Sequence, residues 1–218
     1  IFVEDEDIRV IILTGAGRAF CAGGDLGYLE SLNDDKKRKA FIERVGEMTL
    51  KLRNCAKPVI GMINGVTGGA GVNLMLACDI VCSSEDAKFI QSFVNVGLVP
   101  DCGGMYLLKE TVGLQKAKEL MFTADVISAQ EAEKLKMVMH VYTKEDLKIE
   151  TEKIAQKIAQ GAPMAIMYMK KMLNKSYANL KDFLDEEALV QTFCLGTEDC
   201  KEGILAFKQK RQPNFQGK

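Results

Sequence analysis

Short apolar runs alternate with glycine-rich turns in the first part of the chain. Residues 9–14 form a β-branched run that stops at Gly15, and residues 59–63 and 79–82 form two more short runs. Apolar runs of this length, bounded by glycine or proline, are typical of buried strands. The pattern therefore predicts three strands here and a fourth at residues 137–142.

Longer segments with helical spacing of apolar positions dominate the second half. Ser128 followed by Glu131 is a capping box, which marks a helix start. Helices are predicted at residues 35–54, 72–77, 144–160, 163–176, 179–195 and 197–209. Strand–helix alternation followed by helices argues for one α/β domain over residues 1–218, with an α/β core at 1–145 and a helical part at 146–218.

The composition is that of an ordinary globular protein. The 218 residues are 47% hydrophobic and 27% charged, which suffices for one substantial core. A net charge of −1 argues against nucleic-acid binding, which needs a basic excess on one face. The basic run at residues 36–39 is typical of a solvated helix start. No apolar run approaches the roughly 18 residues of a membrane span, so no membrane partner is predicted.

Seven cysteines are scattered along the chain without a C-x-x-C pair, and His140 is the single histidine. Zinc and disulfide frameworks are therefore not predicted, and neither a metal nor a redox cofactor is expected. Scattered thiols fit the cytoplasm or another reducing compartment. The sequence starts at Ile1, so we expect the protein's own beginning to be absent, which leaves a targeting signal upstream open.

Two glycine-rich turns, at residues 20–26 and 64–71, follow predicted buried strands. Neither matches the G-x-G-x-x-G pattern of dinucleotide-binding proteins, because Phe20 and Leu74 stand where the third glycine belongs. Glycines let backbone N–H groups approach a ligand, and the second turn opens a helix whose free N–H groups favour negative charge. Two converging donors would form an oxyanion hole. Tight packing of strand on helix explains the same glycines equally well.

Several stretches together resemble one family. They are residues 20–26, 57–60, 64–66, 78–80, 97–101 and 206–215. In order and spacing they resemble the enoyl-CoA hydratase/isomerase (crotonase) superfamily over essentially the whole chain. The resemblance implies the crotonase fold, a spiral of ββα units with a helical C-terminal part that makes contacts between subunits. It implies a homotrimer or a dimer of trimers, and the family's opening hairpin and first helix are missing from the pattern.

Carried over residue by residue, the resemblance implies that the N–H groups of Gly24 and Ala70 bind the thioester oxygen of a coenzyme A substrate. The other predicted substrate-binding residues are Ala22, Gly23 and Asp25 near the CoA adenine, with Leu26, Gly69, Asn73 and Phe93, and with Phe207 and Lys210 reaching the CoA of a neighbouring subunit. A core position for Phe207 and a solvated helix end for Lys210 are equally open.

The departures from the family pattern concern its carboxylates. Asn73 and Phe93 occupy the two positions where hydratases of the family carry glutamates. Adding water to a double bond needs one group to activate the water and another to deliver a proton. Asp101 remains, and it resembles the acid of the 1,2-epoxyphenylacetyl-CoA isomerases and of some Δ3,Δ2-enoyl-CoA isomerases. Local sequence alone favours a helix N-cap for Asp101, whereas the family context favours a catalytic role.

These residues favour an acyl-CoA isomerase that shifts a double bond, or rearranges an epoxide-derived ring. The oxyanion hole would stabilise a thioester enolate, and Asp101 would carry the proton. Its apolar neighbours Phe93, Leu98 and Val99 would raise its pKa. Two alternatives stay open: an enoyl-CoA hydratase that uses Asp101 with water held by Asn73, and a non-catalytic acyl-CoA-binding protein.

Overall fold

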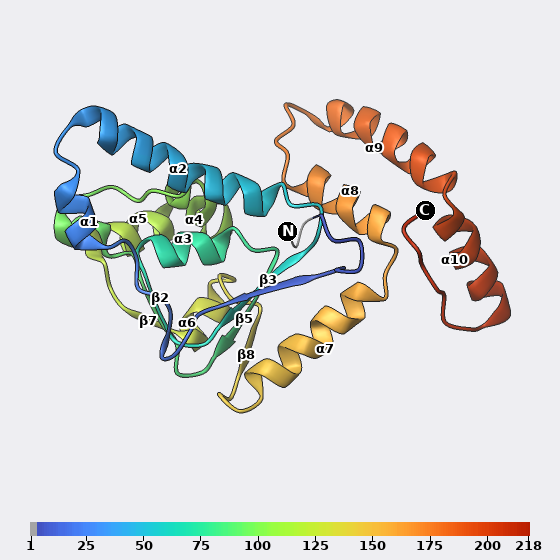
Figure 1. Ribbon diagram of the computed structural model, residues 1–218, viewed down its shortest axis with the longest axis horizontal. Coiled ribbons are helices and arrows are strands. Elements are labelled where there is room, and N and C mark those ends of the chain that lie inside the picture. The colour runs from blue at the N-terminus through green and yellow to red at the C-terminus, as the bar shows by residue number, and fades with distance from the viewer. Residues whose placement is uncertain (1–3) are drawn as a thin grey trace. The chain divides into compact units, whose positions relative to one another are not determined.

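The computed structural model describes residues 4–218, whose strands form two four-stranded sheets and are joined and followed by helices (Figure 1). The first sheet has the order β1 (Ile11–Thr14), β3 (Val59–Ile63), β5 (Ile80–Ser84) and β8 (His140–Tyr142). The second has the order β2 (Ala19–Cys21), β4 (Val66–Gly68), β6 (Lys88–Ile90) and β7 (Ile127–Ser128). Pairing is parallel from β3 to β5 to β8 and from β2 to β4 to β6, and antiparallel between β6 and β7.

The helices fall into two groups along the chain. Those that accompany the strands are α1 (Leu26–Ser31), α2 (Asp35–Arg53), α3 (Ala70–Leu76), the 3-10 helix η1 (Ser92–Val96), α4 (Gly104–Val112), α5 (Leu114–Thr123) and α6 (Ala129–Lys134). Those that follow the strands are α7 (Leu147–Ala159), α8 (Pro163–Leu173), α9 (Leu180–Leu195) and α10 (Glu198–Gln209).

The chain forms two compact units. One comprises Ile12–Arg53 and Val59–Glu152, and the other comprises the described residues up to Ile11 with Asn54–Pro58 and Lys153–Lys218. The first unit holds the main apolar core, in which Ile63 of β3 and Phe89 of β6 are almost fully buried. Strands of the second sheet pack their side chains into this core, which fixes the positions of the turns that follow them.

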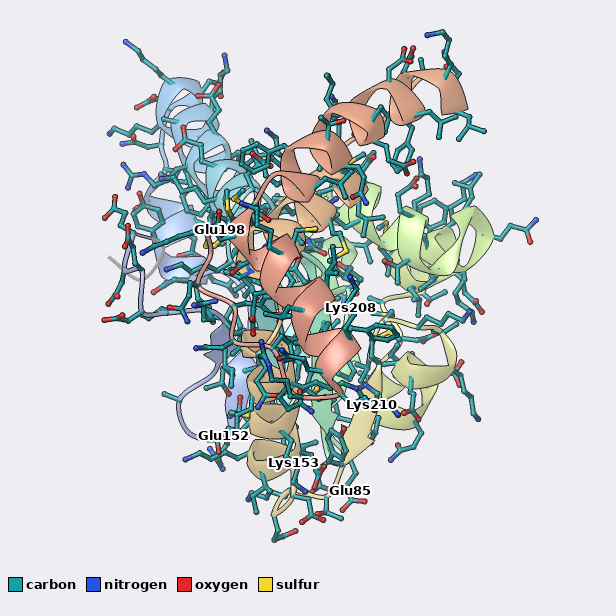
Figure 2. All side chains as sticks on the ribbon, turned by 90° about the vertical axis from the view of Figure 1, so that its right-hand side faces the viewer. Glu85, Glu152, Lys153, Glu198, Lys208 and Lys210 are labelled. Atoms are coloured by element: carbon teal, nitrogen blue, oxygen red, sulfur yellow. The ribbon has the colours of Figure 1, made fainter. Side chains whose placement is uncertain are left out.

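The tail of the second unit is tied to the start of α10. Asp199 is buried in the first turn, and its carboxylate accepts the N–H groups of Gln216 and Gly217 at 2.7 and 2.8 Å. Glu198 lies at the start of α10, and Lys208 and Lys210 lie at its other end (Figure 2). Acidic groups at the start and basic groups at the end both stabilise the helix dipole.

The predicted α/β class is confirmed, and the predicted strands at 59–63 and 79–82 correspond to β3 and β5. Ser128 caps α6 as predicted, because its hydroxyl accepts the N–H of Glu131 at 3.2 Å. The strands predicted at 9–14 and 137–142 are shorter, at Ile11–Thr14 and His140–Tyr142. The second sheet was not predicted, since its strands of two or three residues are too short to show an apolar period.

Candidate active site

A cavity of about 590 Å³ lies within the first unit, between the second-sheet turns and the helices α1, α2 and α3. Its wall is mainly apolar. The helices α1 and α2 contribute Leu29, Phe41, Ile42, Val45 and Met48, and α3 contributes Ala70 and Leu74. Such a cavity suits a ligand with a hydrocarbon part, because burying apolar surface from water is favourable.

The two glycine-rich turns meet at one edge of the second sheet. β2 and β4 are parallel neighbours, with Cys21 opposite Thr67, so the turns at their carboxyl ends lie side by side. Gly23 has φ +110°, and a side chain added there would lie 3.3 Å from the Gly68 carbonyl oxygen and 4.0 Å from the Ala70 nitrogen. Gly24 and Ala70, the two predicted N–H donors, both line the cavity.

Gly71 explains how α3 comes so close to the first turn. A β-carbon at this position would lie 2.2 Å from the Cys21 carbonyl oxygen, which is far inside van der Waals contact. Only glycine therefore lets α3 pack directly on the backbone of β2. The preceding Gly69, with φ +49°, is the N-cap of α3 and provides no side-chain cap. The glycines thus serve tight packing, and this packing brings the two turns together.

Asp101 lies on the same cavity, between η1 and α4. Its Oδ1 atom is buried and has no hydrogen-bond partner among residues 4–218. Burial raises the pKa of this carboxyl, and interactions with the neighbouring Cys102 thiol and with the backbone N–H of Asp101 partly offset the rise. The alternative of a side-chain helix cap does not hold, because the N-cap of α4 is Gly103 and no side chain caps it.

Phe93 lines the cavity, as do Leu98 and Val99, the residues expected to surround Asp101 with apolar atoms. Asn73 does not line it. Its side chain is fully buried, its Nδ2 donates to the Asp101 carbonyl oxygen at 3.0 Å, and its Oδ1 accepts from Gln91 at 2.8 Å. The Asn73 amide therefore contacts the backbone of Asp101 and does not reach the cavity.

Cys102 is a buried thiol on the cavity wall, only 3% exposed. Burial, together with the neighbouring Asp101 carboxylate, raises its pKa to about 12. A thiol with such a pKa is uncharged at neutral pH and is a poor nucleophile. Cys102 therefore fills space beside the Asp101 carboxyl group.

The remaining predicted ligand contacts lie outside this cavity lining. Ala22 is exposed, and Leu26, which begins α1, is also exposed. Asp25 is the N-cap of α1, because its carboxylate accepts the N–H of Tyr28 at 3.0 Å. Phe207, on α10, is 85% exposed, so it is not a core residue of this chain, and Lys210 is the exposed C-cap of α10.

The cavity wall on α2 was missed as a site from the sequence. Phe41, Val45 and Met48 are apolar positions within the helix predicted at residues 35–54, and no motif marks them as ligand contacts. Their spacing of four and three residues places them on one helix face, and this face lies over the cavity. The spacing predicts a shared face, but it does not reveal that the face meets a cavity.

The described residues 4–218 contain no cluster of three or more histidine, cysteine or acidic side chains that could hold a metal ion. His140 is exposed on β8 and does not line the cavity. Within the same residues, no helix has both the length and the apolar character that crossing a membrane requires.

The sequence matches the family described as enoyl-CoA hydratase/isomerase over residues 2–218. The chain belongs to the enoyl-CoA hydratase/isomerase family. It is 36% identical over 219 residues to the 1,2-epoxyphenylacetyl-CoA isomerase of Escherichia coli (strain K12), and the match covers 99% of this chain and 84% of that protein. It is also 36% identical over 220 residues to the "Probable enoyl-CoA hydratase, mitochondrial" of Dictyostelium discoideum, with coverage of 100% and 78%.

The fold of this enoyl-CoA hydratase/isomerase family member has close counterparts among solved structures. The crystal structure of an enoyl-CoA hydratase from Bacillus anthracis matches it with a TM-score of 0.94 and 34% identity, covering 100% of this chain and 84% of that chain. The crotonase fold predicted from the sequence is therefore confirmed. Hydratases and isomerases both occur among such relatives, so the choice between the two reactions depends on the residues of the cavity.

Proposed function

We propose that this protein is an acyl-CoA isomerase that moves a double bond, or rearranges an epoxide-derived ring, by proton transfer through Asp101. The observation that carries the proposal is the position of this side chain. Asp101 is the single carboxylic acid among the cavity-lining residues, and its buried Oδ1 has no partner within residues 4–218. A carboxylate in these apolar surroundings has a raised pKa, which suits a group that must both take and give a proton.

The proposed step begins with the thioester oxygen against the N–H groups of Gly24 and Ala70. Asp101 removes a proton from C2 of a 3-enoyl group, and the electron pair moves to the thioester oxygen as an enolate. Backbone donors directed at that oxygen stabilise the developing charge. The protonated Asp101 then returns the proton to C4, so the double bond moves from C3–C4 to C2–C3 and no water is consumed.

The hydratase alternative needs a second group to hold and activate water. Asn73 was the candidate, but its amide is buried behind Asp101 and already engaged by Gln91 and the Asp101 carbonyl. Phe93, at the other position that would carry a glutamate, presents only an apolar ring to the cavity. The cavity therefore favours proton transfer between two carbons over hydration.

The deciding experiment compares two substrates with purified wild type and Asp101→Asn. A 3-enoyl-CoA in D₂O is expected to isomerise with wild type, and to take up deuterium to the extent that the protonated Asp101 exchanges with the solvent, while crotonyl-CoA is hydrated far more slowly. Asp101→Asn should lower isomerisation by about 100- to 10,000-fold, the usual contribution of a general acid–base group. The exposed Asp86 provides a matched control, and Asp86→Asn should keep the wild-type rate.

Equal isomerisation by wild type and Asp101→Asn would contradict the proposal. Crotonyl-CoA hydration that is faster than isomerisation and lost in Asp101→Asn would support the hydratase alternative. Tight acyl-CoA binding with neither isomerisation nor deuterium uptake would support a non-catalytic binding protein.

The predicted trimer, or dimer of trimers, is part of the same proposal. In this assembly Phe207 and Lys210 reach the CoA of a neighbouring subunit, and the exposure of the Phe207 ring suits a contact with another copy. Sedimentation of wild type and Phe207→Ser tests this assignment. We expect a trimer or hexamer for wild type and weaker assembly for the variant, whereas a monomeric wild type would contradict it.

A further inference from the structure

A chain of two buried amides ends on the backbone of Asp101. Gln91 donates from Nε2 to Oδ1 of Asn73 at 2.8 Å, and Asn73 donates from Nδ2 to the Asp101 carbonyl oxygen at 3.0 Å. The first hydrogen bond fixes which way the Asn73 amide faces, because only its oxygen can accept from Gln91. The Asn73 donor is therefore held toward Asp101.

The start of α4 contacts both the Asp101 carbonyl and the Asn73 amide. The N–H of Gly104 also donates to the Asp101 carbonyl oxygen, at 2.8 Å. A β-carbon at Gly104 would lie 2.2 Å from the amide atoms of Asn73, so the helix backbone packs directly on that amide. The Asp101 carbonyl thus accepts two hydrogen bonds, which use both of its lone pairs.

Helix α3 carries one of the two proposed N–H donors, Ala70, and also the amide of Asn73 that contacts Asp101. Ala70 and Asn73 lie three residues apart on α3, which corresponds to a rise of about 4.5 Å along the helix. Any movement of α3 that shifts the Ala70 N–H also shifts the group that holds Asp101. We propose that Asn73 and Gln91 are positioning residues that fix Asp101 relative to the Ala70 N–H. This inference rests on the proposed function, in which these two groups act on one substrate.

The chemistry of the pair argues for positioning over packing. The Oε1 atom of Gln91 is buried and has no hydrogen-bond partner among residues 4–218. A buried unpartnered acceptor lowers the free energy of unfolding. An apolar side chain of the same size would therefore pack at this position with higher stability. Methionine has a similar volume and lacks this atom, but it cannot orient Asn73.

The first test places Asn73→Asp in two backgrounds. The substitution keeps the shape of the side chain but replaces its donor by an acceptor, and it is expected to lower deuterium exchange about ten- to a hundredfold in an otherwise wild-type chain, as a misplaced catalytic group does. In the Asp101→Asn background it should leave the residual exchange unchanged, because the residue that it positions is already disabled. Asn95→Asp, on the exposed part of η1, is the matched control and should retain the wild-type rate.

Three outcomes separate the hypotheses. An unchanged rate for Asn73→Asp overturns the positioning role alone. An equal fractional loss in both backgrounds also overturns it, because the damage is then independent of Asp101. Full activity of the single variant Asp101→Asn overturns the proposed function and the positioning role together.

Gln91→Met provides a second test, which holds even if Asn73→Asp does not fold. It removes the unpartnered Oε1 but also takes the donor away from the buried Asn73 Oδ1, so the two effects oppose each other and the melting temperature should stay near that of wild type. The kcat should nevertheless fall about tenfold with KM nearly unchanged, because the loss concerns the transition state and not substrate binding. A kcat equal to that of wild type, or a loss only in proportion to lost stability, would overturn the inference.

Discussion

The Cys102 thiol lies beside the carboxyl group of Asp101, its neighbour in sequence and on the cavity wall. The thiol and the backbone N–H of Asp101 both favour the ionised carboxylate, whereas the burial of Asp101 disfavours it. Burial is the larger effect, so the pKa of Asp101 is raised. The pKa of the proposed proton carrier therefore depends on burial and on two opposing contacts, one of which a single substitution removes.

The pH dependence of isomerisation should report this balance. The carboxylate of Asp101 must be ionised to accept the first proton, so kcat should fall as the pH drops through the raised pKa. Cys102→Ala removes the thiol donor and should move the acidic midpoint of the kcat profile to higher pH. Cys194→Ala, on α9, should leave the midpoint in place. An acidic midpoint that does not respond to Cys102→Ala would contradict this account of the Asp101 environment.

Asp101 should also make the fold less stable at neutral pH. The pKa of Asp101 is higher in the folded than in the unfolded chain, so the protonated carboxyl favours folding relative to the ionised one. This contribution to stability is fully present below the unfolded pKa and is lost as the pH rises through the folded pKa. Asp101→Asn resembles the protonated carboxyl and should gain about 1 kcal/mol in free energy of unfolding at pH 7. Urea unfolding at several pH values checks this, with a gain expected to shrink toward acidic pH. A variant that is less stable than wild type at pH 7 would show that the carboxylate stabilises the fold.

The site could be predicted from the sequence where short motifs define it. Gly24 and Ala70 stand in glycine-rich turns, and Asp101 was identified by the carboxylates that Asn73 and Phe93 replace. All three groups line one cavity. Local patterns carry such information because each turn's geometry depends on a few adjacent residues.

The partners of Asn73 could not be predicted in the same way. Its contacts with Gln91 and Asp101 join residues 18 and 28 positions apart, and no local pattern encodes them. The position of α2 over the cavity is likewise a tertiary feature. The short strands of the second sheet were hidden for a different reason, since two or three residues cannot show a period.

Gly71→Ala should separate the two turns that supply the N–H donors. The added methyl group would meet the Cys21 carbonyl oxygen at 2.2 Å, so β2 and α3 must move apart. We expect a loss of about 1–3 kcal/mol in the free energy of unfolding, as for other overpacked sites. We also expect a lower kcat, because the N–H groups of Gly24 and Ala70, the proposed oxyanion-hole donors, would move apart.

Gly46→Ala is the matched control for this substitution. Gly46 lies within α2, and a β-carbon there would meet nothing within 4 Å. Alanine is the better helix former by about 1 kcal/mol, so this variant should be as stable as wild type or more stable. Thermal unfolding and kcat should be measured for both variants. A Gly71→Ala protein with wild-type stability and rate would show that the close approach of α3 to the Cys21 carbonyl is not required.

Val45→Phe should change which acyl chains the enzyme accepts. Val45 faces the cavity from α2, so the larger ring would occupy part of its volume of about 590 Å³. The kcat/KM for a decenoyl-CoA should fall relative to that for a hexenoyl-CoA by at least about 10- to 200-fold, the range for a misfit of a single methylene group in an apolar pocket. Leu50→Phe enlarges an exposed side chain on the same helix, away from the cavity lining, and should preserve the wild-type preference. An unchanged ratio in Val45→Phe would mean that the acyl chain does not extend beneath α2, because a chain lying there could not avoid the added ring.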